Sequence, residues 1–291
     1  MTWFYIALLS SFLSAFSTIG EKKVLLNIGA LKFSFLLSIT NLLFSLPFFF
    51  TIDYSAINGY NISILFIKSV LGVAAFLCVM TSIKNLELSK ALPLLALTPG
   101  FVAVFAFLFL GEELRSTEII GLLLLVVGTY ILESKKLKEV LSPFSVFVKS
   151  RYHHYVVFAL LLFTASSILD KVLLVKLNFT PTSLIAFQHF FFAFLFLAVF
   201  IFFRDKNEPG LLNVRKNDLI LIVVISILTI GYRYTQIVAV SMASVALTLA
   251  VKRTSVFWAT IIGGKIFKET NLLKKTISVL LIVIGTILIL R

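Results

Sequence analysis

The residues with the clearest chemical potential are two adjacent cations, Lys252 and Arg253, in the middle of a long apolar run. A Lys or Arg at the centre of a bilayer costs roughly 2.5 to 3.5 kcal/mol, so this pair must face protein or water. At helical spacing Lys252 shares one stripe with Ser244, Thr248 and Ser255. We interpret this stripe as the wall of a hydrated cavity.

Further polar residues in other apolar runs could border the same cavity, and we take them as candidate substrate-binding residues. They are Tyr232, Arg233, Gln236, Gln188 and His189. His189 could contact substrate, relay a proton or form a hydrogen bond between helices.

The charges at this depth are unbalanced. Lys252, Arg253 and Arg233 are cationic, and the nearest acid, Asp170, lies toward a helix end, where it cannot neutralise three bases. Arg binds carboxylates and phosphates bidentately and Lys binds them as a point charge. We therefore expect the substrate to carry an anionic group.

Two acid-lysine pairs, Glu21-Lys22 and Asp170-Lys171, lie where the first and sixth apolar runs approach the surface. Each pair could form a gate, and Asp170 could carry a coupling proton. Alternatively, the lysines snorkel beside solvated acids, as we expect for Lys68 in the third run.

Composition identifies the setting of these residues. Of the 291 residues 60% are hydrophobic and only 13% are charged, against about 25% charged in soluble domains, so soluble enzyme folds are excluded. The net charge of +13 falls mostly in short loops beside apolar runs, which indicates membrane topology and no nucleic-acid partner. The single cysteine, Cys78, excludes a disulfide framework and a thiolate cluster, and we expect no metal and no cofactor.

Continuous apolar runs predict an all-α integral membrane protein, since barrel strands would alternate with period two. The predicted fold has ten transmembrane helices: Trp3 to Ile19, Leu31 to Phe50, Ile62 to Ile83, Ala91 to Leu110, Glu118 to Leu132, Tyr155 to Leu174, Thr182 to Phe203, Leu219 to Ala239, Ala243 to Phe267, and Leu273 to Leu290.

The two halves of the chain match weakly. Glu118 to Leu132 aligns with Lys275 to Ile289, and the same offset pairs Glu112 with Glu269. Because five is an odd number, two five-helix repeats must have opposite orientations in the bilayer. We predict a first repeat at 1–134, a basic connecting loop at 135–154 and a second repeat at 155–291.

Small residues recur seven apart on the fifth and tenth predicted helices, as Gly121 with Gly128 and Ser278 with Gly285. Such faces permit close helix packing, and they could form a homodimer.

Lys and Arg concentrate in every second connection, whereas the remaining connections hold only Arg115, Lys171 and Lys176. This bias places both termini outside the cell.

The motifs resemble the drug/metabolite transporter superfamily and, more narrowly, its EamA-type branch. They are GEEL at Gly111 to Leu114, FKE at Phe267 to Glu269, the endings VGTYIL and IGTILI, and the Lys-Arg segment Val251 to Glu269. The resemblance implies a secondary transporter with a central cavity lined by helices one to four and six to nine, with helices five and ten at the periphery. It also implies cytoplasmic termini, opposite to the charge bias.

We therefore predict an exporter of a small polar, anionic or zwitterionic metabolite, such as an amino acid or an organic or phosphorylated acid. It would work by alternating access in the cell (inner) membrane, coupled to a proton or a counter-substrate. A lipid-modifying membrane enzyme is a weaker alternative, because no clustered acids, His or nucleophile suggest catalysis. A channel is the third possible function. It is disfavoured because inverted repeats around a cationic centre suit alternating access better than a continuous pore.

Overall fold

The computed structural model describes residues 2–52, 54, 57–86, 95, 98–111, 113, 115–133, 151–203, 214–266, and the single positions 277, 278, 280, 281, 284, 285 and 288. The elements within these ranges are all helices. Most of the predicted connecting loop, the motif residues Glu112 and Glu269, and most of the predicted tenth helix lie outside the described residues.

The first half of the chain forms long helices from its apolar runs. Pro47 is the second residue of a 3₁₀ helix that follows α2, because proline cannot continue the α-helical hydrogen bonding. Asn58 caps the third helix by accepting a hydrogen bond from the Asn61 amide at 2.9 Å. The elements are α1 (Thr2–Leu25), α2 (Ala30–Ser45), η1 (Leu46–Thr51), α3 (Gly59–Asn85), α5 (Thr98–Leu110) and α6 (Ser116–Glu133).

The second half of the chain also forms long helices from its apolar runs, with two irregularities. After Lys171 the chain continues as a short π-helix, and a turn at Thr254 separates the last two described helices. The elements are α8 (Arg151–Lys171), η4 (Val172–Lys176), α9 (Pro181–Phe203), α10 (Lys216–Met242), α11 (Val245–Arg253) and α12 (Ser255–Ile266). Helix α8 thus begins four residues before the predicted start at Tyr155.

Seven of the described helical segments are long and apolar enough to cross a membrane. They correspond to predicted helices one to three and six to nine. The predicted helix Glu118 to Leu132 lies within the shorter α6, and the described part of Ala91 to Leu110 is chiefly α5. The full set of ten transmembrane helices stays a prediction.

The ninth predicted helix is not continuous, which corrects the sequence-based expectation for Ala243 to Phe267. The Thr254 amide bonds to the Val251 carbonyl at 3.1 Å, three residues back, and the Thr254 hydroxyl bonds to the same carbonyl at 2.8 Å. A threonine hydroxyl that competes for backbone carbonyls bends a helix. The break follows directly after Lys252 and Arg253.

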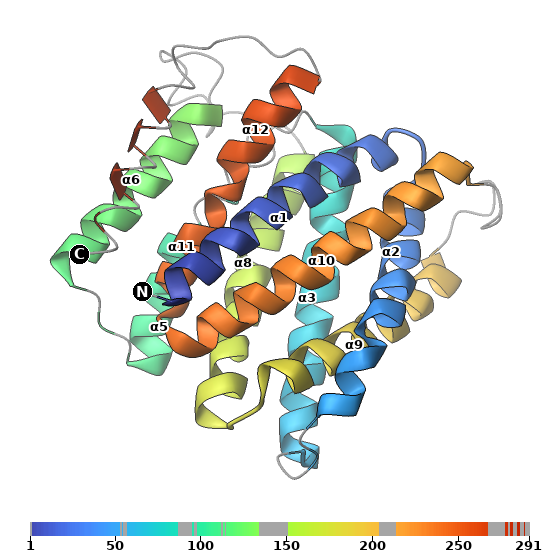
Figure 1. The fold of residues 1–291 in the computed structure, drawn as a ribbon, viewed down its shortest axis with the longest axis horizontal. Coiled ribbons are helices and arrows are strands. Elements are labelled where there is room, and N and C mark those ends of the chain that lie inside the picture. Colours follow the sequence, from blue (N-terminus) through green and yellow to red (C-terminus); the bar gives the residue numbers. More distant parts are fainter. Residues whose placement is uncertain are drawn as a thin grey trace.

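Helices of the two halves pack against each other in pairs. Helix α1 packs mainly on α10, α3 on α8, and α2 on α9. Figure 1 shows α1 and α10 side by side across the front of the molecule. Gly20 allows the first contact, because a Cβ there would lie 2.9 Å from Ile225 Cγ1.

Helix α6 lies at one edge of the molecule, beside the described C-terminal residues (Figure 1). A Cβ on Gly285 would lie 2.7 Å from the Gly121 carbonyl oxygen, so the small faces of the fifth and tenth predicted helices meet within one chain. A homodimer through these helices stays a prediction.

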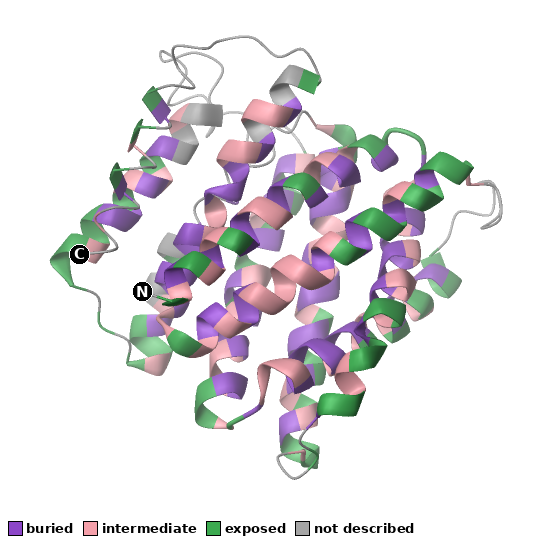
Figure 2. Cartoon of the chain, in the orientation of Figure 1, coloured by how far each residue is buried: buried purple, intermediate pink, exposed green. Residues whose placement is uncertain are grey.

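Many large apolar side chains point outward, as Figure 2 shows for the outer faces of the helices. Phe202 and Phe203 are 79% and 76% exposed. Several polar side chains of α1, including Ser10, Ser11 and Ser17, are instead buried. This distribution is typical of a protein whose outer surface meets lipid.

Candidate functional site

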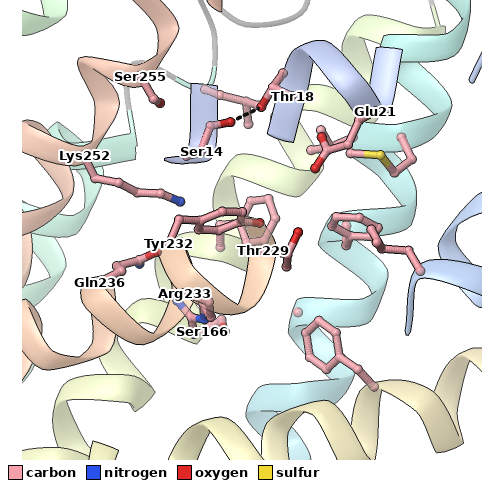
Figure 3. A pocket seen from close by; sticks show the side chains of 18 of the residues that line it. Ser14, Thr18, Glu21, Ser166, Thr229, Tyr232, Arg233, Gln236, Lys252 and Ser255 are labelled. Carbon is pink, nitrogen blue, oxygen red and sulfur yellow. Dashed lines mark hydrogen bonds between the residues drawn. The ribbon is translucent and has the colours of Figure 1, made fainter. Parts of the chain in front are cut away.

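A cavity of about 190 Å³ lies among helices from both halves. Its lining combines an apolar surface with ionisable and hydroxyl-bearing side chains. Among the predicted site residues, the lining includes Lys252, Arg253, Arg233, Tyr232, Gln236, Gln188, His189, Asp170 and Glu21. Figure 3 shows several of these side chains around the cavity, with the Tyr232 ring near its middle.

A buried ion cluster joins one helix of the first half to helices of the second half. Asp170 of α8 forms ion pairs with Lys68 of α3, at 2.9 Å, and with Arg233 of α10, whose Nη2 also donates a hydrogen bond to Oδ2 at 2.7 Å. Gln188 of α9 accepts from Arg233 Nη2 at 2.9 Å and also from Lys68. The cluster therefore balances part of the positive charge inside the protein.

This cluster corrects three expectations from the sequence. Asp170 is only 3% exposed although it lies near the end of α8, because α3 and α10 pack against α8 there and present Lys68 and Arg233 to its carboxylate. Arg233 consequently has a carboxylate partner at its own depth. Lys68 does not snorkel to a surface, since it is 1% exposed and bound to Asp170.

Lys252 lies at the end of α11 with its ammonium 4.8 Å above the centre of the Tyr232 ring. Among the described residues no carboxylate forms an ion pair with it. An aromatic face attracts a cation but does not neutralise its charge. The adjacent Arg253 turns to α5, where its Nη2 donates to the Thr98 hydroxyl at 3.0 Å.

Glu21 of α1 is 4% exposed and lines the cavity, contrary to the expectation of a solvated acid near the surface. Its Oε1 accepts from the Ser17 hydroxyl at 2.9 Å. Within the described part of the chain, neither Glu21 nor Asp170 forms an ion pair with the lysine that follows it. A gating role for Glu21-Lys22 and Asp170-Lys171 stays a prediction.

The two lysines instead bind the ends of neighbouring helices. Lys22 donates to the carbonyls of Ile83 and Leu86, at 2.5 and 3.0 Å, at the end of α3. Lys171 donates to the carbonyls of Val240 and Ala243, at 3.1 and 2.6 Å, at the end of α10. Carbonyls at a helix end lack intrahelical partners, so each lysine satisfies two of them. Neither lysine lines the cavity.

Besides Asp170, whose Oδ1 is ion-paired with Lys68, two cavity residues keep buried polar atoms without a hydrogen-bond partner among the described residues. No described residue hydrogen-bonds to Nδ1 or Nε2 of His189, which is 2% exposed, or to Oε1 of Gln236, which is 4% exposed. Unsatisfied polar groups are costly in a buried setting, so native proteins rarely keep them without a reason. His189 therefore forms no side-chain hydrogen bond to another helix among the described residues, which was one interpretation of this residue.

Ser244 and Thr248 are the predicted binding residues that the structure leaves outside the cavity. Ser244 precedes the first residue of α11, and Thr248 is fully buried with its hydroxyl 3.4 Å from the Ala239 carbonyl. The polar stripe of the ninth predicted helix therefore lines the cavity only through Lys252 and Ser255.

Sequence reasoning missed Lys68 as a cluster member and the aromatic part of the wall. A lone lysine well inside an apolar run was the available signal for Lys68. The wall includes Phe76, Phe163, Phe192 and Phe196. Apolar residues are too common in this chain for their sequence positions to mark them as lining.

The arrangement is that of a multi-helix membrane transporter, with a polar cavity enclosed between two halves of the chain. The model of the EamA-like transporter family matches residues 1–134 and 152–291, so the chain belongs to this family. A solved crystal structure, described only as that of a protein, has a TM-score of 0.75 at 14% identity, covering 99% of this chain and 96% of that one. No curated protein sequence matches.

Family membership makes the protein an integral, multi-pass membrane transporter of the drug/metabolite transporter superfamily. The solved structure supports the fold alone, since the identity is low.

Proposed function

We propose that the protein is a secondary transporter that exports a small anionic or zwitterionic metabolite across the cell (inner) membrane. The observation that carries this proposal is Lys252, a cavity cation with no ion-pair partner among the described residues. A substrate carboxylate or phosphate would supply that partner through a charge-assisted hydrogen bond, which is stronger than a neutral one.

The charges around the cavity favour an anion over a cation as the group that Lys252 binds. Asp170 is engaged by both Lys68 and Arg233. The cavity lining and the ion cluster hold Lys68, Arg233, Lys252 and Arg253 against Asp170 and Glu21, so positive charge is in excess among these residues even when both acids are ionised. A net negative ligand, or a zwitterion oriented by its carboxylate, offsets it.

Alternating access between two inverted repeats is the mechanism that we propose. The helix pairs support it. If α1, α2 and α3 correspond to α8, α9 and α10, exchange of the halves turns the contact of α1 with α10 into the contact of α8 with α3. The contact of α2 with α9 is unchanged by the same exchange. The lysine contacts have the same correspondence, since Lys22 binds the end of α3 as Lys171 binds the end of α10. Rocking of one half against the other would expose the cavity to each side in turn.

The test is a thermal-shift screen of purified protein with amino acids, organic acids and phosphorylated metabolites. A compound that binds only the folded state raises the melting temperature. We expect anionic or zwitterionic compounds to stabilise the wild type and Lys252→Ala to lose about tenfold or more in their affinity, as for a lost hydrogen bond to a charged group. Lys216→Ala, which removes an exposed lysine at the start of α10, is the matched control. Equal binding by Lys252→Ala would contradict the proposal.

A further inference from the structure

The cavity extends unequally toward the two ends of the helix bundle. We call them the α1–α2 end and the α8–α9 end, after the helix connections found there (Figure 1). The apolar cluster at the α1–α2 end supplies part of the cavity lining, including Leu37, Met80, Ile83 and Val256. Among the described members of the cluster at the α8–α9 end, Leu249 alone lines the cavity. The cavity therefore reaches toward the α1–α2 end and is closed toward the α8–α9 end.

The apolar cluster at the α8–α9 end, which we call the plug, fills the space between the two halves. Its members include side chains at most 1% exposed from both halves: Leu65 of α3, Leu173 of η4, Leu184 of α9, Ile237 of α10 and Val245 of α11. Beside it, the Phe48 ring of η1 stacks on Tyr234 of α10, with 5.3 Å between the ring centres. Side chains packed in this way leave no path for a polar solute.

The ion cluster of Lys68, Asp170, Gln188 and Arg233 lies between the cavity and the plug. Each of its members is about one helical turn from a plug residue in the sequence. Lys68 follows Leu65, Asp170 precedes Leu173, Gln188 follows Leu184, and Arg233 precedes Ile237. On the other side, Asp170, Gln188 and Arg233 line the cavity. The cluster therefore forms the boundary between the cavity and the plug.

Lys68 connects the two halves at this boundary. It belongs to α3 of the first half, and its ammonium pairs with Asp170 Oδ1 at 2.9 Å and donates to Gln188. Arg233 also pairs with Asp170, but both of these residues belong to the second half. Within the described cluster, separation of the halves must therefore break the contacts of Lys68 and can leave the pair of Arg233 and Asp170 intact.

The matching acid of the first half has no such contact. Glu21 corresponds to Asp170, because each is followed by a lysine that binds the carbonyls at a helix end. Glu21 lines the cavity, and its Oε1 accepts from Ser17 of the same helix. Among the described residues, no ion pair joins Glu21 to the second half. An ion pair between the halves thus accompanies the end that is closed.

We propose that the Lys68-Asp170 pair is the latch of a gate at the α8–α9 end. The pair is intact while the plug is packed and separates when the cavity opens to that end. This proposal rests on the proposed function, in which the two halves rock against each other. In the closed state Lys68 and Asp170 are 1% and 4% exposed at their side chains, so each charge depends on the other. Once the plug opens, water solvates both charges and their contact is no longer needed.

The latch should therefore favour the state that is closed at the α8–α9 end. Lys68→Met leaves Asp170 Oδ1 without its cation in the closed state, whereas water can bind this oxygen in the open state. Loss of a buried hydrogen bond to a charged group should increase the population of the open state about tenfold or more. Alternating access requires the α1–α2 end to close at the same time.

The experiment measures how fast a charged maleimide modifies single cysteines in purified protein held in lipid nanodiscs, where both ends are accessible. Cys78→Ala removes the single native cysteine. Val245→Cys reports on the plug, and Thr18→Cys reports on the half-exposed cavity wall near Glu21. We expect Lys68→Met to raise the modification rate of Val245→Cys about tenfold or more and to lower that of Thr18→Cys.

Two further variants separate the latch from other effects of the substitution. Lys216→Met removes an exposed lysine and should change neither rate. The double variant Lys68→Met with Asp170→Asn removes both charges of the latch and leaves no unpaired carboxylate. It should show the same two rate changes, and it serves as the test if Lys68→Met alone does not fold. The melting temperature of each variant shows whether it is folded.

Three results would overturn the proposal. They are unchanged rates in Lys68→Met, a faster Val245→Cys reaction without a slower Thr18→Cys reaction, and wild-type rates in the double variant. The second result would indicate local opening of the plug rather than a gate. Because these rates need no substrate, the test is separate from that of the proposed anion site. If Lys252→Ala binds anions like the wild type while both rates change as expected, the anion site fails and the latch stands.

Discussion

Replacement of Asp170 by asparagine should destabilise the protein strongly, because two cations would lose their common counter-ion. Lys68 and Asp170 are 1% and 4% exposed at their side chains, and Arg233 is 14% exposed. Removal of one partner from a buried ion pair costs about 3 to 5 kcal/mol, since the other charge remains in a medium that solvates it poorly. We expect a loss of this size for Asp170→Asn.

The cluster also predicts a rescue. In the Asp170→Asn background, Lys68→Met removes the more deeply buried cation, while Arg233 keeps its hydrogen bonds to Gln188. We therefore expect the double variant to recover at least half of the lost stability. This non-additivity distinguishes a charge effect from a packing defect, because two unrelated defects would add.

Unfolding of the detergent-solubilised protein by heat or by titration with denaturing detergent measures these changes. Lys216→Met, at an exposed position, controls for loss of a lysine. The reasoning would be refuted if Asp170→Asn were as stable as the wild type, or if Lys68→Met lowered the stability of Asp170→Asn further.

Two further predictions concern helix packing. Gly285→Ala should cost about 1 to 3 kcal/mol, because its Cβ would lie 2.7 Å from the Gly121 carbonyl oxygen and the backbone cannot easily move. Gly59→Ala is the control, because a Cβ there has no atom within 4 Å, and it should change the stability little. Equal stability of the Gly285→Ala and Gly59→Ala variants would contradict the close contact at Gly285. Thr254→Val should cost about 1 to 3 kcal/mol, because Ser11 would lose its buried partner at 2.7 Å. A double-mutant cycle with Ser11→Ala should show coupling above about 0.5 kcal/mol, and additive losses would argue against the bond.

The helices could be predicted from the sequence, because continuous apolar runs of this length have few alternatives to membrane-spanning helices. The cavity was partly predictable as well, because polar side chains inside apolar runs must face the protein interior or water. Lys252, Arg233 and Gln236 could not face lipid, and the structure places all three around one cavity.

The pairing inside the cavity could not be predicted. Asp170, Lys68 and Arg233 belong to α8, α3 and α10, and their contacts depend on how these helices cross rather than on their spacing in the sequence. The sequence placed Asp170 near a helix end and therefore near the surface, but Lys68 of α3 and Arg233 of α10 cover its carboxylate. The break at Thr254 was equally hidden, because it depends on one hydroxyl bonded to Val251 and Ser11.

The most direct measurement of the central claim is counterflow in proteoliposomes loaded with the compound that binds best in the screen. The wild type and Lys216→Ala should take up labelled compound against its gradient, with a rate that saturates. Lys252→Ala should lose most of this uptake while it remains folded, because its cavity no longer offers the unpaired cation. Uptake by Lys252→Ala at the wild-type rate would contradict the account, and uptake that never saturates would indicate a channel.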